Sequence, residues 1–303
     1  MTRLDPKVIL MAIRPKTLGA AIAPVLMGTA LAYYHKVLRL EFAAFAMLGA
    51  LLIQIGTNLA NDYFDFVQGA DTEERLGPVR VTQAGLLSPT TVKWWFVSTF
   101  ALAVLMGVPL MVRGGWPIIL IGILSVISGV WYTKGSYSLA YTGLADIFVL
   151  IFFGPVAVGG TYFVQGLTIS WPILVLGAGP GLVAMGLLAV NNLRDIDNDR
   201  KADKLTLAVR FGPTFARLEY TVCFVLAALL PWVVFAVTGK FLYTGAASLV
   251  LLLSIPTQRV VWSTRDGEAL NGALAATGKW LVIYSLLFSV GLVLSVWIHH
   301  GQL

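Results

Sequence analysis

The stretch FAAFAMLGALLIQIGTNLANDYFD, residues 42–65, indicates the fold class of this chain. Its first nineteen residues carry no charged side chain, and the chain then turns polar at Asn61, Asp62 and Asp65. One helix needs roughly 20 apolar residues to cross a bilayer core of about 30 Å. The stretch therefore predicts a membrane-spanning helix that ends in carboxylates at the membrane surface.

Similar apolar runs recur along the whole chain. Of its 303 residues, 58% are hydrophobic and only 12% are charged, with one cysteine, Cys223. Soluble domains carry about 25% charged residues, so the composition excludes a soluble enzyme, a disordered protein and a disulfide-stapled secreted domain. Since backbone groups must satisfy one another in lipid, we predict an all-α polytopic membrane protein. We expect one integral-membrane domain, residues 1–303, with nine transmembrane helices near residues 18–34, 42–60, 94–112, 116–133, 144–163, 171–191, 221–238, 243–261 and 280–298.

The basic residues predict the orientation. With nine spans and a cytoplasmic N-terminus, 17 of the 21 Lys and Arg residues fall on the cytoplasmic side, and four fall on the other: Lys36, Arg39, Arg113 and Lys240. Cytoplasmic loops of membrane proteins are enriched in Lys and Arg. The basic excess therefore indicates topology rather than nucleic-acid binding, and we expect a multi-pass protein of the bacterial cytoplasmic (inner) membrane.

The acidic residues gather in two places. Of the 15 Asp and Glu residues, five lie between residues 62 and 74 and four between residues 195 and 203, both on the predicted cytoplasmic side. Helical spacing groups two sets of side chains on shared faces, namely Asn58, Asp62 and Asp65, and Asn191, Asp195 and Asp199. Stacked carboxylates repel one another, and oxygen ligands suit Mg²⁺, which completes its shell with water and substrate phosphates. The two patches predict a Mg²⁺-bridged diphosphate, although either patch alone could consist of helix caps or solvated loop charges.

Several motifs, in this order, resemble one family. NDYFD at 61–65 and DIDND at 195–199, on a nine-span scaffold, are similar to the Asp-rich motifs of the UbiA superfamily of intramembrane aromatic prenyltransferases. RPKTL at 14–18, GPVR at 77–80, YTGLAD at 141–146 and TLAVRFG at 206–212 resemble its 1,4-dihydroxy-2-naphthoate branch. The first motif departs from the family pattern, with Gly69 where a third Asp is usual and the next acid at Asp71.

This resemblance implies an activity and a site. A prenyl chain would pass from polyprenyl or phytyl diphosphate to 1,4-dihydroxy-2-naphthoate with loss of CO₂ and diphosphate, in menaquinone or phylloquinone biosynthesis. The catalytic residues would be Asp62, Asp65, Asp195 and Asp199, which would hold Mg²⁺ together with Asn58 and Asn191. The expected substrate-binding residues are Arg14, Lys16, Asn58, Asn61, Arg80, Tyr132, Lys134, Arg194 and Lys204. The expected partners are the two substrates and the lipid bilayer, with no nucleic acid.

Two alternatives stay open at this point. The acceptor could be another aromatic acid, such as 4-hydroxybenzoate or homogentisate. A cation transporter would also place carboxylates in the membrane. Transporter sites, however, lie near the bilayer midplane, whereas these acids lie at one predicted face.

Overall fold

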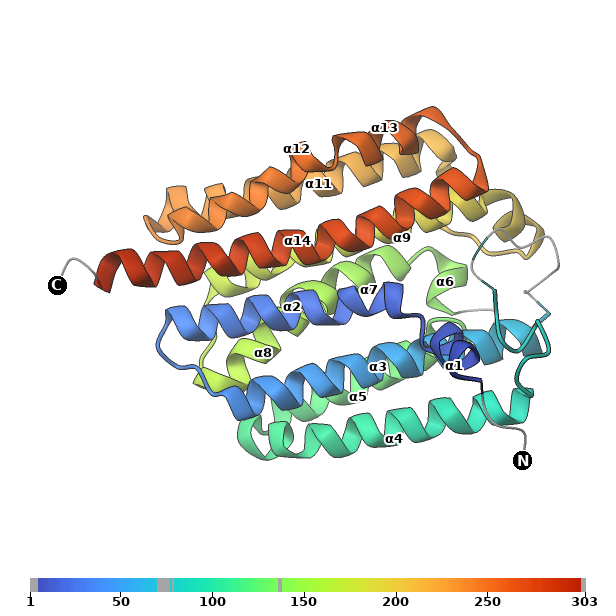
Figure 1. Cartoon of the computed structure of the whole chain (residues 1–303), viewed down its shortest axis with the longest axis horizontal. Helices are drawn as coiled ribbons and strands as arrows, with labels where there is room; N and C mark the ends of the chain where they lie inside the picture. The colour runs from blue at the N-terminus through green and yellow to red at the C-terminus, as the bar shows by residue number, and fades with distance from the viewer. Residues whose placement is uncertain (1–4, 70–76, 78, 136–137, 301–303) are drawn as a thin grey trace.

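The computed structural model describes residues 5–69, 77, 79–135 and 138–300, and these residues form helices without any strand. The helices lie side by side along the long axis of the molecule, and the two termini lie at opposite ends (Figure 1). The elements are α1 (Pro6–Ile13), α2 (Pro15–Tyr34), α3 (Leu40–Val67), α4 (Pro89–Gly114), α5 (Trp116–Trp131), α6 (Leu139–Thr142), α7 (Ala145–Ile151), η1 (Phe152–Val156), α8 (Ala157–Gly166), α9 (Trp171–Lys201), α10 (Leu207–Phe211), α11 (Pro213–Thr238), η2 (Leu242–Ser248), α12 (Leu249–Leu253), α13 (Ile255–Ser263) and α14 (Gly267–His300).

Each predicted span coincides with helical structure, but the spans differ in length. Within the described residues, eight helical stretches are long and apolar enough to cross a membrane. The predicted span at 116–133 is the 16-residue α5, which at 1.5 Å per residue is about 24 Å long and shorter than a bilayer core. The all-helical membrane architecture is thus confirmed, whereas the count of nine spans stays a prediction.

The helices that carry the Asp-rich motifs extend beyond their apolar runs. α3 continues to Val67 and α9 continues to Lys201, past the predicted spans, which end near residues 60 and 191; the helical spacing of the motifs predicts this continuation through Asp65 and Asp199. α14 likewise begins at Gly267 instead of near residue 280. The polar turns remain helical because neighbouring elements pair with their side chains, and the motifs consequently lie on helix surfaces.

One span is bent where α9 packs against it. The stretch from α7 to α8 contains the π-helical turn η1, in which Gly154 leaves helical geometry and Pro155 lacks a backbone N–H. The backbones approach closely at this bend, since a Cβ on Gly181 of α9 would lie 2.2 Å from the backbone oxygen of Leu150. The bend therefore lets α9 lie directly against its neighbour.

α9 is the central helix of the molecule. In its most apolar window 72% of residues are buried, against 17% for α3 and for α4. It packs against α11, α14, α7 and η1. Large apolar side chains such as Val112 (82% exposed) and Trp116 (74% exposed) lie on the outer surface, as expected where helices face lipid.

Candidate functional site

Both Asp-rich motifs lie at one end of the bundle, the end that carries α1 and α6 (Figure 1). In the first motif, Asp62 on α3 is 2% exposed and accepts backbone N–H bonds from Val81 and Thr82, each 3.1 Å long. The Nη2 atom of Arg14 lies 3.8 Å from the same carboxylate. Asp62 therefore fastens the segment after α3 onto that helix, close to the α1–α2 junction.

Asp65, one helical turn further along α3, joins the first motif to the second. Its carboxylate is 3% exposed and pairs with Arg80 through one oxygen. The other oxygen lies 3.6 Å from the Nζ atom of Lys204, which follows α9. Asp199 on α9 interacts electrostatically with Lys204 and Asp65. The two motifs, far apart in sequence, therefore face each other.

Arg194 organises the second motif. Its side chain is 2% exposed and donates to both carboxylate oxygens of Asp195, at 2.8 and 2.5 Å. The same guanidinium donates to Asn191 at 2.9 Å and to Asn271 of α14 at 2.7 Å. This network holds Asp195 in a fixed orientation and links α9 to α14.

The turn after α5 is tied to the end of α3. Thr133 donates to Asn61 at 2.6 Å, and the side-chain amide of Gln68 donates to the Thr133 carbonyl at 3.0 Å. The Nζ atom of Lys134 lies 5.7 Å from the centre of the Phe64 ring. Tyr132 lies within electrostatic reach of Asp65, Asp199 and Arg80. These contacts place the predicted residues Asn61, Tyr132 and Lys134 beside the two motifs.

Other predicted residues have different positions. Asn58 donates through its amide nitrogen to the Ile13 carbonyl and to the Thr17 hydroxyl, both at 2.9 Å, and so fixes the α1–α2 junction against α3. Lys16 is exposed at the start of α2, and no ion pair to it occurs within the described parts of the chain. Asp71 lies outside the described residues.

Each of the four motif aspartates has a cation close to it. The four motif aspartates lie among four cations, namely Arg14, Arg80, Arg194 and Lys204. Among the residues that the structure describes, no three His, Cys, Asp or Glu side chains are grouped closely enough to hold a metal ion. One oxygen of Asp65 is nevertheless buried without a hydrogen-bond partner in that part of the chain. This donor set suits Mg²⁺, which usually takes one or two carboxylates and completes its shell with water and substrate phosphates.

Comparison with known proteins agrees with a site of this kind. The model of the UbiA prenyltransferase family matches residues 21–274, most of the chain. The chain belongs to the UbiA prenyltransferase family. The predicted resemblance is thereby confirmed, and membership in this enzyme family gives no support to the transporter alternative.

Relatives of this UbiA-family chain point to one branch. The chain is 35% identical over 298 residues to a 1,4-dihydroxy-2-naphthoate octaprenyltransferase of Escherichia coli, covering 95% of this chain and 96% of that protein. A protein of the same name from Mycobacterium tuberculosis is 37% identical, with 90% and 92% coverage. Among solved structures, a UbiA homolog from Archaeoglobus fulgidus bound to GPP and Mg²⁺ has a TM-score of 0.67 at 14% identity, over 93% of this chain and 99% of that one. At that identity the likeness concerns the fold alone.

Sequence reasoning missed three polar residues of this UbiA-family chain. Asn271, which holds Arg194, lies on the part of α14 before the predicted span. Asp146 of α7 and Glu219 of α11 are 1% and 9% exposed, and their carboxyl groups interact directly. Both acids lie at the ends of apolar runs, and that position could have predicted that they pair. A buried carboxyl group without a cation needs a partner that shares its proton.

Proposed function

We propose that this protein transfers a prenyl chain from a polyprenyl diphosphate to 1,4-dihydroxy-2-naphthoate, releasing diphosphate and CO₂, in menaquinone biosynthesis. The observation that carries the proposal is the meeting of the two Asp-rich helix ends through Lys204 and Asp65. The relatives named for this reaction, at 35% and 37% identity over nearly the whole chain, favour this acceptor over 4-hydroxybenzoate and homogentisate. A phytyl donor is the alternative that the assay below includes.

Some of the charged side chains would bind the metal, and others would bind the diphosphate. Asp62, Asp65, Asp195 and Asp199 would hold Mg²⁺, with Asn58 and Asn191 as neutral ligands. When bound, Mg²⁺ neutralises the charge that grows on the departing diphosphate. Arg80, Arg194 and Lys204 would donate to phosphate oxygens, because Arg and Lys make strong charge-assisted bonds to phosphate. In the complex, these cations would leave their present carboxylate partners and bind phosphate. The carboxylates released in this way would bind the metal.

The acceptor and the allylic cation need other groups. Attack from the carboxylate-bearing ring carbon forms the new carbon–carbon bond, and that carboxylate then leaves as CO₂. Arg14, beside Asp62, and Lys16 are the cations proposed to hold the carboxylate of the acceptor. Aromatic faces stabilise cations, and Tyr141 already lies beneath Lys204, with the Nζ atom 5.3 Å from the ring centre.

We propose that the site opens at the cytoplasmic face of the bacterial inner membrane. Nine spans, with α5 as a short one, put 17 of the 21 Lys and Arg residues on the side of the two motifs. That distribution is the one that positively charged cytoplasmic loops produce. Residues 1–303 would form a single membrane domain.

The proposal is tested with the purified protein in detergent. The protein is given 1,4-dihydroxy-2-naphthoate, a polyprenyl diphosphate and Mg²⁺, and diphosphate and CO₂ are measured together. We expect equal amounts of both products and complete loss with EDTA, restored by excess Mg²⁺. Parallel reactions with phytyl diphosphate, 4-hydroxybenzoate and homogentisate should be much slower.

α9 supplies a matched control. Asp195→Asn and Asp199→Asn should lower the rate by about 10²-fold or more, the usual cost of removing a group that stabilises transition-state charge. Asp197→Asn, on the same helix, should leave the rate unchanged, since its side chain is 68% exposed and pairs with Arg265 on the surface at 2.8 Å. Diphosphate release with another acceptor alone would overturn the assigned acceptor. Activity that survives EDTA would overturn the metal role.

A further inference from the structure

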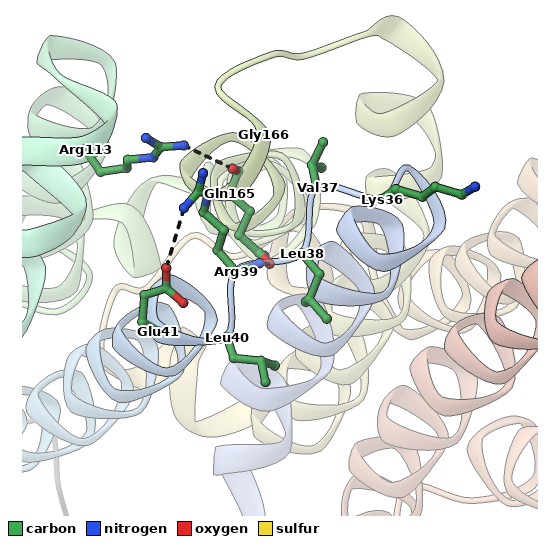
Figure 2. A pocket seen from close by; sticks show the side chains of 9 residues that line it. All are labelled: Lys36, Val37, Leu38, Arg39, Leu40, Glu41, Arg113, Gln165 and Gly166. Atoms are coloured by element: carbon green, nitrogen blue, oxygen red, sulfur yellow. Dashed lines mark hydrogen bonds and ion pairs between the residues drawn. The ribbon is translucent and has the colours of Figure 1, made fainter.

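A hollow lies at the opposite end of the bundle from the Asp-rich motifs. It has a volume of about 640 Å³ and is formed by residues 36–41 between α2 and α3, by Arg113 near the end of α4, and by Gln165 and Gly166 at the end of α8 (Figure 2). Lys36, Arg39 and Arg113 line it, and Glu41 is its one acid. The lining therefore carries a net positive charge.

Gln165, at the end of α8, contacts both arginine residues. Gln165 is 1% exposed, and its own amide nitrogen is held by the Thr161 carbonyl at 2.9 Å. Its side-chain oxygen accepts the backbone N–H of Arg39 at 3.2 Å, and its backbone oxygen accepts from Arg113 at 3.5 Å. Figure 2 shows the side chains of Arg39 and Arg113 with Gln165 on one side of the hollow, while Lys36 points away from them. Gln165 thus holds the backbone of Arg39 and one guanidinium nitrogen of Arg113, while the Arg39 side chain itself is 51% exposed.

The guanidinium groups have few acceptors for their donors. The Nε atom of Arg113 is buried and has no hydrogen-bond partner among the described residues, and its guanidinium lies 5.4 Å from the centre of the Phe42 ring. Arg39 reaches Glu41 only at 3.9 Å, and both side chains are more than half exposed, so this pair is weak. A guanidinium group matches the oxygens of a phosphate, which accepts its paired N–H bonds.

The surroundings favour a ligand that is also apolar. Leu40 lines the hollow and is 67% exposed, and Val112 next to Arg113 is 82% exposed. Trp116, 74% exposed at the start of α5, has the position of a membrane-interface anchor. Three of the four Lys and Arg residues predicted for this side of the membrane line this one hollow, although basic residues are generally depleted there.

We propose that this hollow binds the phosphate of an anionic phospholipid through Arg39 and Arg113, with the acyl chains against Leu40 and the neighbouring lipid-facing helices. Basic pockets between membrane helices recognise anionic headgroups in this way. The ligand chemistry is a phosphate oxyanion, and the attached acyl chains distinguish it from free phosphate. The site is independent of prenyl transfer.

The test uses the full-length protein, stripped of lipid in detergent, with phosphatidylglycerol and phosphatidylcholine as probes. Binding is followed by native mass spectrometry and by the shift in Tm. We expect phosphatidylglycerol to bind at least about tenfold more tightly than phosphatidylcholine and to raise Tm, because both lipids offer a phosphate but the choline cation of phosphatidylcholine would face Lys36, Arg39 and Arg113, and such like-charge contacts are costly. The Arg39→Gln/Arg113→Gln variant should lose this preference.

Lys240→Gln is the matched control, because Lys240 lies on the same predicted side but does not line the hollow. It should keep the preference for phosphatidylglycerol. If the Gln substitutions misfold, Arg39→Lys/Arg113→Lys provides a second variant, because it retains the charge. It is used as a folded, monodisperse sample. Equal binding of both lipids, or equal loss in Lys240→Gln, would overturn the proposal. Displacement by inorganic phosphate at the same concentration as lipid would overturn the lipid assignment.

Discussion

Replacing Asp62 by Asn tests whether this carboxylate is structural as well as catalytic. The side chain is 2% exposed and accepts two backbone N–H bonds, each 3.1 Å long, from the segment that carries Arg80. Asn keeps one acceptor oxygen and turns an amide nitrogen toward the other N–H. One charge-assisted bond is lost, so the free energy of unfolding should fall by about 1.5–3 kcal/mol.

The matched variant is Asp199→Asn. Asp199 faces the like charges of Asp195 and Asp65, with Lys204 as its nearest cation. Burial already disfavours its charge, and removing that charge also relieves the repulsion while weakening one attraction, so the ligand-free protein should be no less stable than the unsubstituted chain. Both variants should lose prenyl transfer if both carboxylates serve the metal site.

The assay is thermal unfolding in detergent, without Mg²⁺ or substrate, followed by an activity measurement on the same samples. At roughly 2–4 °C per kcal/mol, Asp62→Asn should lower Tm by about 3–12 °C, and Asp199→Asn should not lower it. Equal Tm values for both variants would refute the structural role of Asp62. A full rate in Asp62→Asn would refute its role in the reaction.

Three further changes have defined outcomes. Arg80→Met should raise KM for the prenyl diphosphate by about 10–100-fold in steady-state assays, because a charge-assisted phosphate contact is lost. Gly181→Ala should lower stability by about 1–3 kcal/mol, since its Cβ would lie 2.2 Å from a backbone oxygen, whereas Gly49→Ala, with open space around it, should raise Tm slightly. Burial lowers the pKa of the His35 side chain, so as the pH falls the unfolded chain binds a proton at this residue before the folded protein does. The stability should therefore fall as the pH drops below about 6.5. In Tm measurements, His35→Gln should abolish that part of the pH dependence.

Local features of the chain were enough to predict much of this structure. Apolar runs near 20 residues predicted where helices lie, because crossing a bilayer imposes a length and a composition on a single segment. The spacing of Asn58, Asp62 and Asp65 predicted a shared helix face, since that depends only on helical period. The polar start of α14 was not predicted, because its stability comes from partners on other helices.

The pairing of charges could not be read from the sequence. Asp62 accepts backbone N–H bonds from Val81 and Thr82, which the sequence did not predict. Arg194 pairs with Asn271, and Lys204 with Asp65, across wide separations in the chain.

Composition and short-range periodicity therefore determined the class of protein, the helices and the two acidic faces. The packing of the helices against one another determined which cation meets which carboxylate and which groups contact Gln165. Such contacts depend on where distant helices come to lie, and no local pattern of residues encodes that position.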